Sequence, residues 1–117
     1  MGFKFERLTV WQKALALSTL IHELTTSFPR EKLYVLTGQI QRAADSVALN
    51  IAEGSTGQSN AEFKQFLGYA LRSALEVVAC LHLAQRRRLL GHSDFEACYG
   101  KTEEVVKMIQ GLRRSLR

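Results

Sequence analysis

A row of polar side chains follows one face of the segment from residue 29 to residue 53. Its members recur at steps of three and four residues, which aligns side chains on one side of a helix: Gln39, Arg42, Ser46, Asn50 and Glu53. A second row at the same spacing follows in the next helical segment: Tyr69, Ser73 and Glu76. The two rows predict a polar interhelical network built around an Arg42–Glu76 ion pair.

Such a network has two interpretations. Buried polar groups need hydrogen-bond partners, and a satisfied network can fix the register of helices or subunits. The other interpretation is a ligand pocket or a catalytic centre, although charge networks are often only architectural. Neither row supplies a nucleophile beside a base. The sequence therefore favours a structural network and predicts no catalytic residue.

Metal and cofactor motifs are missing from the sequence. No glutamate has a histidine three residues later, the motif that di-iron bundles place on their helices. His22-Glu23 lacks the second histidine of a zincin helix. The run Gly54-Ser55-Thr56-Gly57 is too short for a Walker loop and follows a helical segment. We therefore expect no metal, no cofactor and no enzymatic activity.

Basic residues gather in the last third of the chain, which has a formal net charge of +5. They are Arg86, Arg87, Arg88, Lys101, Lys107, Arg113, Arg114 and Arg117. We expect them to form a basic surface near one end of the molecule. Such a surface is either a solvated face or a contact for nucleic acid. Oligomerisation would multiply the charge and strengthen attraction to phosphates.

Four helical segments must position these residues. Apolar residues recur at steps of three and four in four stretches, at about 9–27, 29–53, 59–90 and 93–116. Short loops between helices make antiparallel neighbours. The sequence therefore predicts a single all-α domain over residues 1–117, folded as an antiparallel up-down-up-down four-helix bundle.

Capping signals mark several of the predicted helix ends. Thr9 with Gln12, and Ser59 with Glu62, have the spacing of capping boxes at helix starts. Gly54 directly follows the second segment, as expected of a residue that ends a helix in the left-handed conformation.

The two cysteines and the apolar runs bear on the compartment. Cys80 and Cys98 fall inside helical patterns without metal-type spacing, so packing is favoured over a disulfide. The N-terminal residues lack the apolar run of a signal peptide. No uninterrupted apolar stretch is long enough to cross a bilayer. We expect a cytoplasmic protein without membrane contact.

Several motifs resemble the four-helix-bundle proteins encoded in intervening sequences of bacterial 23S rRNA genes. The resemblance spans about residues 5–90, and the fourth helix matches by pattern only. It rests on Val10-Trp11-Gln12-Lys13-Ala14, Phe28-Pro29, Gln39-Ile40-Gln41-Arg42-Ala43-Ala44-Asp45-Ser46-Val47, Asn50-Ile51-Ala52-Glu53-Gly54, Glu62-Phe63-Lys64-Gln65-Phe66-Leu67 and Ser73-Ala74-Leu75-Glu76.

This resemblance implies a homopentamer with no established enzymatic activity. It also implies kinship with the accessory variability protein of diversity-generating retroelements, a basic pentamer that binds nucleic acid and a reverse transcriptase. The chain departs from the family pattern at three places: Gln41 replaces a frequent arginine, the loop Ser55–Gln58 is not basic, and Arg72 replaces a frequent glycine. Of the family's paired arginines, only Arg42 carries over.

Two functional hypotheses follow. The first is a non-catalytic, homo-oligomeric protein that binds RNA or a ribonucleoprotein partner through its basic surface. The alternative is a structural or protein-interaction module that binds no nucleic acid, in which the polar rows organise the oligomer.

Overall fold

The computed structural model describes residues 2–117, with the side chains of residues 30–34 outside that description. These residues form one short 3-10 helix and four α-helices, and no strand occurs among them. The elements are η1 (Lys4–Arg7), α1 (Thr9–Thr25), α2 (Arg30–Ser55), α3 (Asn60–Arg86) and α4 (His92–Ser115). The all-α fold predicted from the sequence is confirmed.

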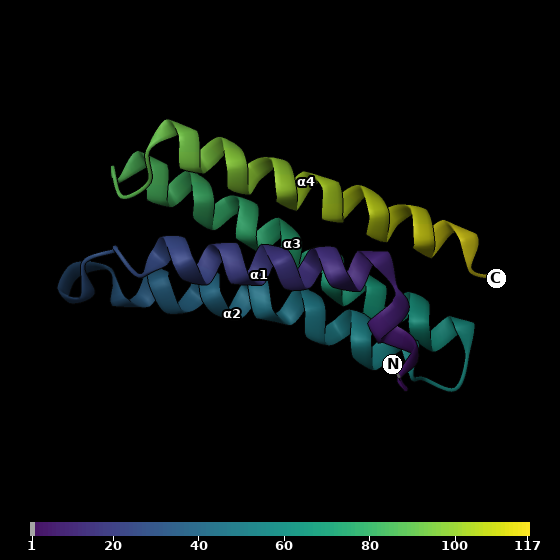
Figure 1. The fold of residues 1–117 in the computed structure, drawn as a ribbon. Coiled ribbons are helices and arrows are strands. Elements are labelled where there is room, and N and C mark those ends of the chain that lie inside the picture. The colour runs from purple at the N-terminus through teal and green to yellow at the C-terminus, as the bar shows by residue number, and fades with distance from the viewer. Residues whose placement is uncertain (1) are drawn as a thin grey trace.

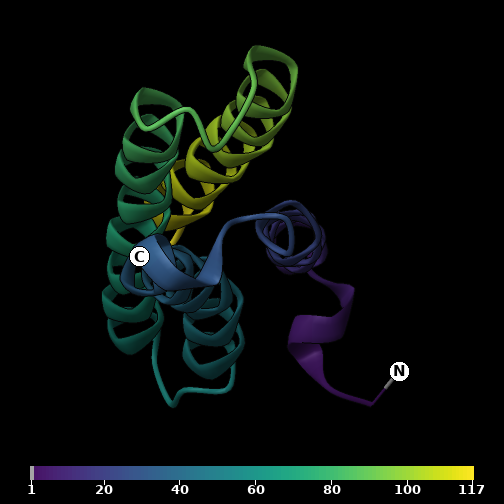
Figure 2. The same ribbon diagram turned by 90° about the vertical axis from the view of Figure 1, so that its left-hand side faces the viewer.

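Each helix runs antiparallel to the next along a body of 44 × 22 × 22 Å (Figure 1). Contacts join α1 to α2, α2 to α3, α3 to α4 and α4 back to α1, and Figure 2 views this arrangement from one end, with α3 and α4 inclined to α1. The predicted up-down-up-down bundle is confirmed. We name its two ends by residues: the Gly54 end holds the α2–α3 loop and both termini, and the Arg88 end holds the other two loops.

The core is built from the apolar stripes that the sequence spacing indicated. Every described helix of the bundle contributes large side chains that are almost completely buried: Leu17, Ile21, Ile40, Val47, Ile51, Leu67, Val77, Leu81, Val105 and Ile109. A polar group inside this core is also satisfied, since Thr102 Oγ1 donates to the Cys98 carbonyl at 2.7 Å. Apolar burial of this kind is the dominant favourable term in folding.

Of the two predicted capping boxes, the structure confirms the N-cap half of the one at Ser59. Ser59 Oγ accepts from the Glu62 amide at 3.1 Å and caps α3. The prediction for Thr9 and Gln12 is wrong, because Leu8 is the N-cap and Thr9 is already helical. The Gln12 side chain instead donates to the Glu6 carbonyl at 2.9 Å, so it fastens η1 to the start of α1.

Gly54 does not end α2 in a left-handed conformation. The helix continues to Ser55, and no described glycine has a positive φ. A Cβ on Gly54 would lie 2.6 Å from Phe66 Cβ and 3.0 Å from Phe63 Cδ1, distances at which the atoms overlap. The glycine is therefore needed for the close approach of α2 to α3, and its interpretation as a helix stop is wrong.

The third helix ends at Arg86, short of the predicted end near residue 90. Arg88 takes the left-handed conformation with φ of 61°. The Leu89 amide donates to the Ala84 carbonyl at 2.9 Å, and the Arg88 amide donates to the Gln85 carbonyl at 3.0 Å. This pair of bonds is a Schellman motif, which normally places glycine where Arg88 stands.

By length and composition α3 is apolar enough to cross a membrane, with mean hydropathy 1.4 over an 18-residue window that is 33% buried. Every such window of α3 includes Arg72 and Glu76, so it is not the uninterrupted apolar stretch that the sequence lacks. A core helix of a bundle passes the same test, and α3 does bury one face in the core. Its outer side also carries two large apolar side chains, Leu75 and Leu83, which are 53% and 43% exposed among polar residues that include Arg72 and Glu76.

We predict opposite effects for alanine at two helical glycines. Gly54→Ala should lower the free energy of unfolding by about 1–3 kcal/mol, because the added methyl group overpacks the α2–α3 contact. Gly100→Ala should raise it by up to about 1 kcal/mol, because that site has nothing within 4 Å and alanine favours the helix. Urea denaturation of both variants measures the difference. Equal effects would contradict the close-approach role of Gly54.

Candidate nucleic-acid interface

A polar seam joins α2 to α3 on the outer side of the bundle. Gln39 Nε2 donates to Glu76 Oε2 at 3.2 Å, and Ser73 Oγ donates to Ser46 Oγ at 3.0 Å. Asn50 Nδ2 donates to both the carbonyl and the hydroxyl of Ser46, each at 2.9 Å. These five residues of the predicted network do come together.

Arg42 and Glu76 share a groove of this seam with Gln39, Ala43, Ser46 and Ser73. No ion pair joins Arg42 to Glu76 among the side chains that the structure describes, so that predicted pair is wrong. The guanidinium lies back along its own helix, where its Nη1 would be 3.0 Å from a Cβ on Gly38. Glu76 is engaged by Gln39 instead.

Two predicted members of the network lie apart from it. The Tyr69 hydroxyl accepts from Gln65 Nε2 at 2.7 Å on its own helix, and its ring meets Phe66 edge-on at 5.5 Å. Glu53 is exposed, and its backbone carbonyl accepts from Thr56 Oγ1 at 2.9 Å.

The basic residues do not form one surface at one end, so that expectation is wrong. Because α3 and α4 are antiparallel, they divide between the two ends of the bundle (Figure 1). The run 86–88 is at the Arg88 end, and Arg113, Arg114 and Arg117 are at the opposite end. Lys101 and Lys107 are exposed along α4 between them.

A basic groove between α3 and α4 lies toward the Gly54 end. It consists of two adjoining hollows that share Leu71 and Arg113, and we call it the Arg113 groove. The remaining lining residues are Lys64, Gln65, Gly68, Tyr69, Arg72, Gln110 and Arg114. Four of the lining side chains are cationic and none is a carboxylate.

Gly68 lets a guanidinium lie across α3. A Cβ at Gly68 would be 3.2 Å from Arg113 Nη2 and 3.4 Å from its Cζ, so a larger residue would push the side chain outward. Lys64 and Arg72 were missed among the sequence candidates for phosphate contact. Their steps of four residues on either side of Gly68 align all three on one helix face, and this was the available signal.

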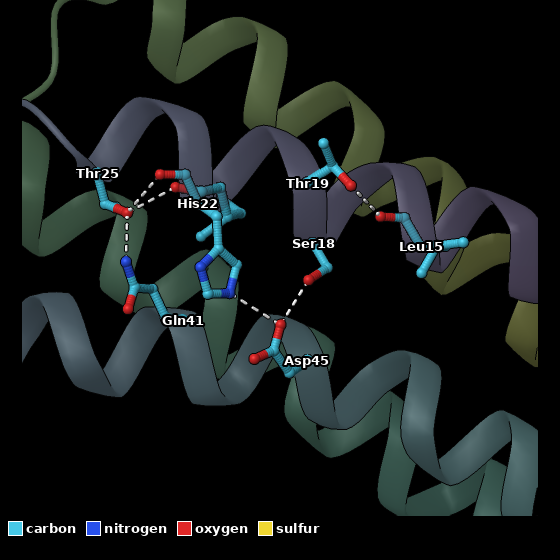
Figure 3. Close-up of polar contacts among 8 residues, drawn as sticks. Leu15, Ser18, Thr19, His22, Thr25, Gln41 and Asp45 are labelled. Carbon is cyan, nitrogen blue, oxygen red and sulfur yellow. Dashed lines mark hydrogen bonds and ion pairs between the residues drawn. The ribbon is translucent and has the colours of Figure 1, made fainter.

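A second polar seam joins α1 to α2 and was also missed by sequence reasoning (Figure 3). Asp45 Oδ1 accepts from Ser18 Oγ at 2.5 Å and lies 2.9 Å from His22 Nε2. Gln41 Nε2 donates to Thr25 Oγ1 at 2.9 Å one turn further along. The residues recur at steps of four and three on α1 and at a step of four on α2, so each set lies on the side of its helix that faces the other helix.

The seam has the residue types of a hydrolase triad but a different arrangement. In a triad the imidazole lies between the hydroxyl and the carboxylate and accepts the proton of the nucleophile. Here the Asp45 carboxylate lies between Ser18 and His22, so the hydroxyl proton points at the acid (Figure 3). The geometry holds two helices together and does not activate Ser18.

The chain matches the family model described as "23S rRNA-intervening sequence protein" over residues 6–111. Among solved structures it is similar to a protein of unknown function from the S23 ribosomal protein family of Bacteroides thetaiotaomicron. That similarity has a TM-score of 0.84 and 27% sequence identity, and covers 90% of this chain and 98% of the other. No curated protein matches the chain.

The two cysteines are free and buried, one on α3 and one on α4. Burial raises the pKa of the Cys98 thiol to about 11, with a further contribution from the Asp94 charge. Burial and the Glu76 charge also raise the pKa of Cys80. Because the thiolate is the reactive form, neither thiol is an activated nucleophile. The described residues also hold no cluster of three potential metal ligands.

We predict that stability falls at alkaline pH through Cys98. Its pKa is raised on folding, so its contribution is complete below about pH 9 and is lost as the pH rises toward about 11. The free energy of unfolding should drop by roughly 1–3 kcal/mol across this window. Urea denaturation from pH 8 to pH 11 should show a smaller drop for Cys98→Ala than for the wild type. An identical drop in both would contradict the assignment.

Proposed function

We propose that this chain, which belongs to the 23S rRNA-intervening sequence protein family, is a non-catalytic homo-oligomer that binds RNA through the Arg113 groove. The observation that carries this proposal is the composition of that groove: Lys64, Arg72, Arg113 and Arg114 line it without any carboxylate.

The groove suits a phosphate backbone. Guanidinium groups form paired, charge-assisted hydrogen bonds with phosphate oxygens, and neutralising phosphates releases counterions, which drives non-specific binding. Tyr69 is 40% exposed at the same place and offers a face on which an unpaired base can stack. Gln65 and Gln110 add amide donors and acceptors to the lining.

The outer face of α2 and α3 supports self-association. Large apolar side chains are exposed beside the α2–α3 polar seam, namely Val35 (74%) and Leu49 (67%) on α2 and Leu83 (43%) on α3. Exposed apolar patches rimmed by polar groups mark interaction surfaces. A second copy of the chain is the occupant that we propose for this face.

The family resemblance makes a pentamer the specific form of this proposal. In a pentamer the formal charge of +5 per chain would be repeated around the ring, which strengthens the attraction of the whole assembly for RNA. The cytoplasmic location and the reverse-transcriptase partner implied by the resemblance stay predictions.

A structural module without RNA binding is the alternative, and the two α-helical seams favour it. The hydrogen bonds between Ser46 and Ser73 and between Ser18 and Asp45 join side chains of neighbouring helices, so these polar side chains have a role in helix pairing without any ligand. The alternative keeps the oligomer and assigns no ligand to the Arg113 groove.

We predict that Arg113→Gln weakens RNA binding. Fluorescence anisotropy with a structured RNA should show a roughly three- to tenfold loss of affinity at low salt. The slope of log affinity against log salt should fall by about one phosphate contact. Lys101→Gln is the matched control, since it removes the same charge from α4 outside the groove and should change affinity less. Wild-type protein that does not bind at low salt would favour the structural alternative.

We predict that carboxylates on the outer α2–α3 face break the oligomer. Leu49→Glu combined with Leu83→Glu should convert the wild-type assembly to monomers in sedimentation velocity, because charges desolvated at an interface are unfavourable. Leu15→Glu is the control: it alters an exposed leucine on α1 and should leave the mass unchanged. A monomeric wild type would overturn the oligomer proposal.

A further inference from the structure

A second cationic hollow lies at the Arg88 end, far from the Arg113 groove. It is lined by His82, Gln85, Arg86 and Arg88. All four side chains can donate hydrogen bonds, and no carboxylate lines the hollow. None of the four side chains makes a hydrogen bond or ion pair with another described residue, so their donors face solvent.

Arg88 occupies this hollow at the expense of backbone strain. Its φ of 61° lies in the left-handed region, which is unfavourable for a residue with a Cβ and is normally filled by glycine at this position of the motif. Backbone strain of this kind is often found at functional sites. The Schellman hydrogen bonds of Arg88 and Leu89 hold the backbone there, so the side chain leaves the helix end in a defined direction.

The imidazole of His82 is oriented by aromatic rings of α4. Its ring meets Phe95 edge-on with centroids 5.1 Å apart and Tyr99 at 6.3 Å. Those two rings stack on each other at 5.7 Å, and Phe95 is buried in the core. The aromatic rings restrict the imidazole on one side, and its exposed side belongs to the hollow.

We propose that this hollow binds a phosphate group as its monoester or free dianion, with the Arg86 and Arg88 guanidinium groups and the His82 and Gln85 side chains as hydrogen-bond donors. Guanidinium groups match phosphate oxygens in geometry and charge. A dianion gains more than a backbone diester from two adjacent cations because the attraction scales with the charge. The acidic residues of the neighbouring α4 turns, Asp94 and Glu96, lie outside the lining.

This site does not depend on the proposed RNA function. This hollow and the Arg113 groove are near opposite ends of a molecule 44 Å long, and they share no lining residue. A single phosphate cannot contact both. Binding at the Arg88 end can therefore be lost or kept independently of the Arg113 groove.

The test is a titration of the full chain with inorganic phosphate at low ionic strength, followed by the NMR signals of the His82 ring and the arginine Nε–Hε groups. Saturable shifts at His82, Arg86 and Arg88 are expected. Arg86→Gln and Arg88→Asn should each weaken binding about three- to fivefold. Asparagine tolerates the left-handed conformation, so Arg88→Asn removes the charge while keeping the turn.

Arg87→Gln is the matched control, since it removes the neighbouring charge without touching the lining, and it should change affinity less than twofold. Arg88→Gly adds a readout that diffuse charge does not predict: it should raise the thermal midpoint by roughly 3–6 °C while binding weakens. Equal loss in Arg87→Gln and Arg88→Asn, or no saturable shift in the wild type, would overturn the proposal.

Two further probes identify the source of the phosphate. A short RNA with a 5′-phosphate and the same RNA with a 5′-hydroxyl are compared in the Arg113→Gln background, which removes a backbone contact elsewhere. Preference for the 5′-phosphate, lost in Arg88→Asn, assigns the site to RNA ends. Equal binding of both RNAs alongside saturable inorganic phosphate assigns it to free phosphate compounds. If the proposed RNA function fails, the inorganic phosphate titration still decides this site.

Discussion

The packing of α2 against α3 at Gly54 is the contact on which the geometry of the outer surface depends. Phe63 and Phe66 of α3 lie where a Cβ of Gly54 would be, so the two backbones approach closely. From this point the antiparallel run of the helices brings Ser46 opposite Ser73 and then Gln39 opposite Glu76. Such a close contact lets α2 slide very little along α3, because protein interiors are close-packed. The polar seam therefore follows from an apolar contact.

The pairing of α3 with α4 controls where charge is found on the other side of α3. Because these two helices are antiparallel, the arginines of the α3 terminus and those of the α4 terminus lie apart, in the hollow at the Arg88 end and in the Arg113 groove. The outer face between these ends is occupied by Leu75 and Leu83. Separated cations repel each other less than a single cluster would. The chain thus has two separate cationic surfaces, and exposed apolar side chains between them.

Sequence spacing predicted the members of the α2–α3 seam better than their pairing. Helical periodicity alone places Ser46 and Asn50 on one face of α2 and Ser73 and Glu76 on one face of α3, and the packing of the two helices then brings these faces together. The Arg42–Glu76 pair failed because long side chains have several rotamers, and Arg42 lies along Gly38 instead. The α1–α2 seam was missed since His22 and Asp45 are 23 residues apart and their meeting depends on the crossing of two helices.

Gly54 and Arg88 show how local sequence signals can mislead about where a helix ends. Gly54 followed the last expected turn and was interpreted as a stop, but it continues the helix for the sake of a tertiary contact. Arg88 lacks any signal for a left-handed turn, yet it takes that conformation just after α3 ends at Arg86. Intrinsic propensities amount to about 1 kcal/mol or less per residue for most types, so packing of neighbouring helices can override them.

The sequence by itself determined four amphipathic helices, their order and their buried faces, because those properties depend on spacing within one segment. It also determined the excess of positive charge and the family motifs. Only the tertiary structure decided which helix ends meet and which donors and acceptors pair. It also decided that the basic residues divide between the Arg113 groove and the hollow at the Arg88 end. Those outcomes depend on the register between segments, which close packing at Gly54 and the turn at Arg88 set and which no single segment contains.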